Sequence, residues 1–235
     1  MQNADILIKI LLKTSPYSYS EGLGINLKSR KSSEIFKWFF ASILFAKPIR
    51  ESSAIKTYRC FSSKNVITPK RILETGWQGL VDILDEDGYT RYDFSTADKL
   101  LEVMKNLIDG YGGDLNKLYS ESKNQKDLEE KLMSLGKGIG KTTVNIFLRE
   151  LRGIWDVEPL PYRFTIEAAK NLGLTSSEEP EAVLKELKKK WKQSIIKNKS
   201  FVNFEAALLK LGKDYCRKNR CNICPLSEYC KKNKK

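Results

Sequence analysis

Apolar residues recur at helical spacing along most of the chain. Intervals of three and four residues, which gather side chains on one face of a helix, occur in eight segments: 35–45, 80–84, 97–108, 128–135, 143–151, 166–172, 182–191 and 204–211. Glycines and prolines fall between these segments, where they mark turns and helix ends. No run of alternating apolar and polar residues indicates a strand. The pattern therefore predicts an all-α protein.

The charge of the chain is strongly positive. Its 235 residues include 42 Lys and Arg against 29 Asp and Glu, a formal net charge of +13. This excess favours a polyanionic partner, nucleic acid before an anionic membrane, although a solvated lysine-rich surface would look the same. No apolar stretch is long enough to cross a bilayer, and that of residues 35–45 ends at Lys47. With no signal peptide evident, we expect an intracellular protein without a membrane partner.

Four of the five cysteines lie close together near the C-terminus. Cys216, Cys221, Cys224 and Cys230 follow the spacing C-x4-C-x2-C-x5-C, and the chain has no histidine. Four thiolates in one short loop are typical of a [4Fe–4S] cluster, whose irons each take one thiolate. Structural zinc is more often held by two CxxC pairs, and two disulfides do not suit an intracellular protein. We predict a [4Fe–4S] cluster, with zinc as the alternative.

A glycine-rich turn separates the predicted helices 128–135 and 143–151. Its residues are Gly136, Lys137, Gly138, Ile139, Gly140 and Lys141. Alternate glycines permit a tight turn, and the amides of the turn and of the next helix suit a phosphate. A P-loop would need a glycine where Leu135 stands, and a preceding strand. A turn between helices without any ligand is the alternative.

This hairpin and the cysteine loop together resemble the endonuclease III family of helix-hairpin-helix DNA glycosylases. The family reads L-P-G-V-G-x-K-T-A-N at the hairpin and C-x6-C-x2-C-x5-C at the cysteines, and the resemblance covers residues 34–230. It implies a monomer with two helical lobes, a hairpin that grips a phosphate of double-stranded DNA, and a damaged or mismatched base flipped into a cleft. The central lobe would span 53–155, and the cluster-bearing lobe 1–52 plus 156–235.

The resemblance also shows a departure at the reactive position of the hairpin. Thr142 stands where bifunctional members carry the lysine that attacks the sugar. Lys141 is one residue earlier, and a one-residue step turns a helical side chain by about 100°. Threonine cannot form a Schiff base with the sugar. The resemblance therefore implies hydrolysis of the base without strand cleavage.

The second reactive group of the family is an aspartate, and its position here is also changed. Leu160 stands at the position reached without a gap, with Asp156 and Glu158 nearby. Glu158 follows a valine and precedes a predicted helix, as the family's Val-Asp does, so we favour it over Asp156. A carboxylate there would stabilise the positive charge that develops on the sugar and orient water. A capping or surface role is the alternative.

Two further segments are candidates for contact with the flipped base and its surroundings. Tyr92 and Asp93 are predicted to line the base pocket, because residues 88–95 combine aromatic and hydrogen-bonding groups. Helix capping is the alternative for Asp93. Lys47 follows Ala46 where the family has Ala-Gln, whose glutamine fills the gap left by the flipped base. We therefore expect Lys47 to contact DNA.

These features together predict a monofunctional DNA repair glycosylase. Two other functions stay open: a damaged-DNA-binding protein that has lost excision, and an iron–sulfur redox protein. The sequence does not identify the base, because pocket shape decides it. Mismatched thymine or uracil, oxidised pyrimidines, and alkylated or deaminated purines are all compatible.

Overall fold

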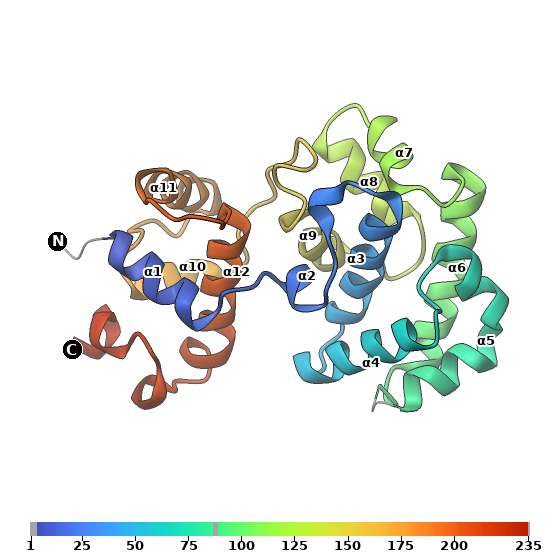
Figure 1. Cartoon of the computed structure of the whole chain (residues 1–235), viewed down its shortest axis with the longest axis horizontal. Helices are drawn as coiled ribbons and strands as arrows, with labels where there is room; N and C mark the ends of the chain where they lie inside the picture. The colour runs from blue at the N-terminus through green and yellow to red at the C-terminus, as the bar shows by residue number, and fades with distance from the viewer. Residues whose placement is uncertain (1–3, 87–88, 235) are drawn as a thin grey trace. The chain divides into compact units, whose positions relative to one another are not determined.

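A computed structural model describes residues 4–86 and 89–234 of the chain (Figure 1). Its α-helices, in chain order, are α1 (Ala4–Thr14), α2 (Tyr19–Gly22), α3 (Ser32–Phe45), α4 (Glu51–Ser63), α5 (Pro69–Glu86), α6 (Asp93–Tyr111), α7 (Leu115–Ser120), α8 (Gln125–Ser134), α9 (Lys141–Arg149), α10 (Arg163–Asn171), α11 (Pro180–Gln193) and α12 (Phe201–Leu211). Within the described ranges there is no strand, so the all-α prediction is confirmed. None of these helices is long and apolar enough to cross a membrane.

The helices divide into two compact units. The larger unit is 23–158, and the smaller one combines Met1–Gly22 with Pro159–Lys235. This division differs from the expected one for residues 23–52 and 156–158, which belong to the larger unit. For residues 23–52 the reason is α3, whose Trp38 indole donates a hydrogen bond to the Phe147 carbonyl of α9 at 3.0 Å.

Helix α3 forms the centre of the larger unit. It is apolar on nearly all sides and packs against α4, α7 and α9. The Phe39 and Phe147 rings meet edge to face, with centroids 5.1 Å apart. Helices α5 and α6 lie side by side along the outer edge of the unit (Figure 1). Burial of so many aromatic rings fixes α3 in this unit, since each fully buried large side chain contributes about 1.5–3 kcal/mol.

The smaller unit has its own core, formed by α1, α10, α11 and α12. A π-helical turn, Gly212–Cys216, leads from α12 into the cysteine segment. Gly212 approaches α10 so closely that an added Cβ would lie 2.1 Å from the Phe164 carbonyl oxygen. Leu226, between two of the cysteines, is fully buried in the same core. The cysteine segment is therefore anchored to the helices at both points.

Candidate functional site

The turn between α8 and α9 is a tight hairpin. The Ile139 N–H donates to the Gly136 carbonyl at 3.1 Å, and the Ile139 side chain is buried. Gly138 has φ +88°, a left-handed conformation that favours glycine. The first amides of α9 have no partner inside the helix, and the dipole makes this end positive. Because Lys137 and Lys141 are also exposed here, the hairpin suits a phosphate.

Side chains of α6 hold the hairpin from the inner side. The Asn106 amide donates to the Leu135 carbonyl at 2.9 Å. The Glu102 carboxylate accepts a hydrogen bond from the Lys137 N–H at 3.0 Å. An added Cβ on Gly136 would lie 2.6 Å from a methyl group of α6, so this glycine permits the close approach. The hairpin backbone is thus positioned by α6 as well as by its own glycines.

Lys99 completes this contact. Its side-chain Nζ donates to the Gly138 carbonyl at 2.9 Å, and the residue is only 8% exposed. Burial, and then the neighbouring charge of Lys47, lower the pKa of Lys99 to about 8. The sequence prediction missed this residue. A signal was present, because Lys99 lies one helical turn before Val103, on a face that the apolar pattern predicts to be buried.

Lys47 and Tyr92 lie together beside Lys99. The Lys47 Nζ is 5.3 Å from the centre of the Tyr92 ring, which Arg91 approaches at 5.6 Å. Tyr92 precedes α6, and Asp93 begins it. The Asp93 carboxylate accepts from the next backbone N–H, of Phe94, at 2.6 Å, which is a local contact at the helix start. The structure thus joins Lys47, Tyr92 and the hairpin into one cationic region.

Thr142 is an exposed residue in the first turn of α9, next to the exposed Lys141. A side chain in this turn lies near the hairpin amides, where a phosphate and its sugar would be held.

The two candidate carboxylates lie in the segment that follows α9. The Asp156 N–H donates to the Tyr119 hydroxyl at 2.8 Å, and the Glu158 N–H donates to the Gln125 side chain at 2.7 Å. The Glu158 side chain is 51% exposed, and its carboxylate lies 3.8 Å from the guanidinium of the buried Arg152. These contacts fix the backbone and leave both carboxylates at the surface.

These anchors are far from the hairpin. Gln125 is the first residue of α8, and the hairpin follows its last residue, Ser134. A helix of 10 residues is about 15 Å long. The structure therefore brings Asp156 and Glu158 together with the start of α8, and it brings Thr142 together with the hairpin at the end.

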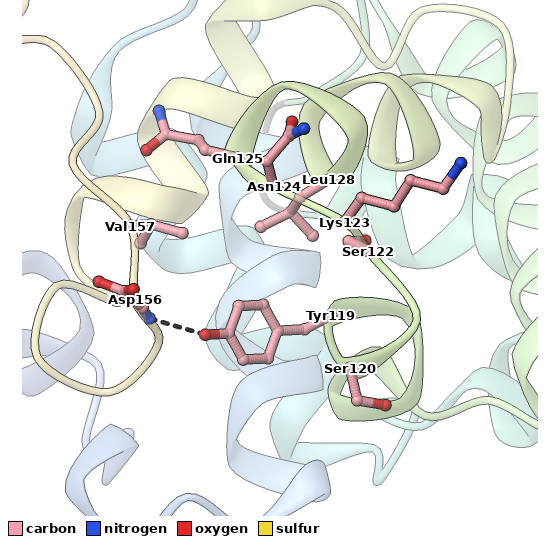
Figure 2. A pocket seen from close by; sticks show the side chains of 9 residues that line it. All are labelled: Tyr119, Ser120, Ser122, Lys123, Asn124, Gln125, Leu128, Asp156 and Val157. Carbon is pink, nitrogen blue, oxygen red and sulfur yellow. Dashed lines mark hydrogen bonds between the residues drawn. The ribbon is translucent and has the colours of Figure 1, made fainter.

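A polar pocket with a volume of about 260 Å³ lies at the start of α8. Figure 2 shows the hydrogen bond between Asp156 and Tyr119 at its edge. Its lining residues are Tyr119, Ser120, Ser122, Lys123, Asn124, Gln125, Leu128, Asp156 and Val157. Asp156 therefore belongs to this pocket, whereas Tyr92 and Asp93 lie at the start of α6.

The four clustered cysteines are free, half-buried thiols of the smaller unit. Burial raises the pKa of the Cys216 thiol, with additional contributions from Glu167, Cys224 and Cys230. Burial likewise raises the pKa of Cys224, which the other neighbouring thiols raise further. The thiols thus lie within electrostatic range of one another. In the described ranges, no three Cys, Asp or Glu residues are arranged to hold a metal ion.

Comparison with known proteins gives the class first. A solved structure of the H. pylori 3-methyladenine DNA glycosylase MagIII, bound to 1,N6-ethenoadenine, matches 92% of this chain and 98% of its own. The TM-score is 0.56 and the sequences are 14% identical, so the likeness shows the fold. The chain has the fold of a helix-hairpin-helix DNA glycosylase.

Sequence relatives give the family. Endonuclease III of Rickettsia felis is 32% identical over 165 residues, covering 69% of this chain and 68% of the relative. Endonuclease III of Rickettsia conorii is 29% identical over 199 residues, covering 83% of each chain. No family model matches. The chain belongs to the endonuclease III family.

Proposed function

We propose that this protein is a monofunctional DNA glycosylase, which removes a damaged or mismatched base by hydrolysis and leaves the strand intact. Family membership gives the coarser statement, a DNA repair glycosylase of the helix-hairpin-helix superfamily. The observation that supports the finer proposal is Thr142, exposed in the first turn after the hairpin. A hydroxyl there offers no amine for a Schiff base.

The hairpin is proposed to hold a backbone phosphate of double-stranded DNA. Exposed Gly138 and Gly140 let the DNA backbone come close, and α6 keeps the amides in place. Lys47, Lys137 and Lys141 add positive charge around this position. Because phosphate contacts carry no sequence information, the hairpin would position any duplex. A single protein chain is sufficient for this contact.

A carboxylate is proposed to stabilise the positive charge that develops on the sugar as the base leaves. Glu158 is our candidate, because its carboxylate is exposed to solvent and lies 3.8 Å from the guanidinium of the buried Arg152, which holds it in place. Asp156 is the second candidate, since it is exposed and lines the pocket at the start of α8. Tyr92 and Asp93 are proposed to contact the base itself, next to Lys47.

The four cysteines Cys216, Cys221, Cys224 and Cys230 are proposed to hold a [4Fe–4S] cluster. A cube needs four thiolates, one for each iron, and the Cys216 and Cys224 thiols lie within electrostatic range of Cys221 and Cys230. When bound, the cluster would supply a cross-link of the C-terminal segment and a redox centre. The donor set contains only sulfur, which suits iron–sulfur chemistry and also zinc.

The cluster proposal is tested by metal analysis of protein made anaerobically with ample iron. We expect a brown protein with about four irons and four acid-labile sulfides per chain. Stoichiometric zinc without labile sulfide would contradict the cluster.

The activity is tested with a panel of duplexes, each containing one damaged or mismatched base, followed by alkali to cut any abasic site. We expect excision from a subset of the panel and none from the undamaged duplex. Base loss on no duplex, with tight duplex binding, would support the alternative of a catalytically silent DNA-binding protein. The placement of both carboxylate anchors at the start of α8, away from the hairpin, is the observation that favours this alternative.

A further inference from the structure

Two exposed aromatic side chains form a pair on the larger unit. Trp77 of α5 is 38% exposed and Phe94 of α6 is 58% exposed. Their ring centroids are 5.2 Å apart, with an angle of 39° between the ring planes. Exposed large aromatic rings are costly to hydrate, and two of them in contact mark an interaction surface more clearly than one alone.

The local backbone presents this pair rigidly. Gly76 has φ 69° and ψ 174°, which interrupts α5 immediately before Trp77. The Trp77 indole N–H donates to the Asp98 carboxylate of α6 at 2.8 Å, so its orientation is fixed. A rigid ring loses little entropy when a ligand stacks on it. The kink and the hydrogen bond therefore hold the exposed indole in one orientation, ready for a ligand to stack on it.

The aromatic pair adjoins the cationic region of the hairpin. Phe94 is two residues from Tyr92, whose ring Lys47 and Arg91 approach. The Lys47 ammonium donates to the Ser95 hydroxyl at 3.5 Å. The charge of Lys47 also helps to lower the pKa of Lys99. Lys99 in turn donates a hydrogen bond to the Gly138 carbonyl of the hairpin, where we propose the phosphate site.

We propose that Trp77 and Phe94 form a stacking platform for an unpaired DNA base beside the hairpin. The inference rests on the proposed DNA binding, and adds a site for a base outside the duplex stack. Bases stack on aromatic rings whatever their identity, and cations next to the rings hold the flanking phosphates. The Asp98 and Asp93 carboxylates accept hydrogen bonds from the Trp77 indole and the Phe94 N–H, whereas the cations Lys47 and Arg91 lie on the neighbouring Tyr92 ring. A DNA base, with an aromatic face for the rings and a flanking phosphate for the cations on the Tyr92 side, therefore matches this surface.

The test measures the affinity of the full-length protein for three DNAs of equal length. These are a fully paired duplex, the same duplex with one unpaired extra base, and the single strand. Phe94→Ala and Trp77→Ala should each weaken binding to the second and third DNA about tenfold. Binding to the paired duplex should change little. Tyr17→Ala is the matched control, because Tyr17 is also 58% exposed and lies in the smaller unit.

The outcomes separate the platform from the proposed enzymatic function. Equal losses on all three DNAs, or no loss on any, would overturn the platform. Wild-type affinity for the paired duplex, and its salt dependence, measure the hairpin site independently. Absence of excision would overturn the glycosylase without touching the platform. Thermal unfolding checks each variant, and Phe94→Ala keeps the test valid if Trp77→Ala fails to fold.

Discussion

The two ends of α8 are held in different ways. At its end, the hairpin is fixed by contacts from Lys99, Glu102 and Asn106, which lie along one face of α6. At its start, the segment with Asp156 and Glu158 is fixed through backbone N–H groups, and both carboxylates stay exposed. The proposed DNA contact through backbone amides is therefore built on a rigid frame. The proposed chemistry depends instead on two exposed carboxylates, those of Asp156 and Glu158.

The largest effect is expected at the carboxylate segment. Glu158→Gln should lower the single-turnover excision rate about 10²–10³-fold, because the charge acts mainly on the transition state. Duplex affinity should stay within about twofold of wild type, as expected for a group that does not position DNA. Asp156→Asn is the matched variant, and a larger loss there would transfer the role to Asp156. Unchanged rates in both variants would direct attention to Asp93.

The next largest effect is expected at the hairpin glycines. Substitutions there separate the rigidity of the hairpin backbone from its accessibility to a phosphate. In Gly138→Ala, the new Cβ would lie 2.8 Å from the Lys99 side chain, at a residue with φ +88°. We expect destabilisation of about 2–4 kcal/mol and weak binding to every duplex. An added Cβ on Gly140 meets nothing within 4 Å. Gly140→Ala should therefore keep its stability and lose duplex affinity, because the Cβ occupies the side that a phosphate approaches.

Calorimetric unfolding and duplex titration of both glycine variants check this pair. Equal duplex affinity of Gly140→Ala and wild type would contradict a close approach of phosphate to the hairpin backbone.

Lys99 provides a smaller effect that depends on pH. Its folded-state pKa of about 8 lies below the ordinary 10.5, so the unfolded chain binds more protons between these values. The unfolding free energy of wild type should therefore rise as pH increases from about 8 to about 10.5, by about 1–3 kcal/mol relative to Lys99→Met. The variant removes the titrating group that faces Lys47 and the Gly138 carbonyl. Denaturant unfolding across this range measures the difference, and parallel curves would contradict a buried ammonium.

The smallest effect concerns the exposed hairpin lysines. Lys137→Ala and Lys141→Ala should each reduce the salt dependence of duplex binding, lowering the slope of log affinity against log salt by about 1. Each should weaken all duplexes alike. Lys126→Ala, an exposed lysine near the start of α8, is the control and should leave the slope unchanged. A slope that none of these variants alters would place the phosphate elsewhere.

Much of the fold could be predicted from the sequence, because helical spacing and glycine turns are local signals. The hairpin between α8 and α9 lies where the glycines predict it. Helix α5 extends further than the predicted segment 80–84, since Gly76 is a kink within it and Gly79 lies in regular helix. Gly76 therefore marks a bend in α5 and not its end, because the helix continues where it packs against α6.

The arrangement of the site was less predictable. The helical spacing indicates that Lys99 is buried, but it does not indicate the partner of Lys99, a carbonyl 39 residues away in sequence. The assignment of residues 23–52 to the larger unit depends on buried rings of α3 that meet α9. The separation of Glu158 from the hairpin follows from its bond to Gln125. Each of these is a tertiary contact, which local sequence patterns do not encode.

We propose that the hairpin of this chain binds DNA for base hydrolysis without an amine that attacks the sugar. The most direct measurement follows the fate of the strand on a duplex from which the protein releases a base. With Thr142 at the reactive position, we expect an intact strand until alkali is added, and no protein–DNA adduct with borohydride. Efficient borohydride trapping, with strand cleavage before alkali, would contradict it and show that a lysine reaches the sugar.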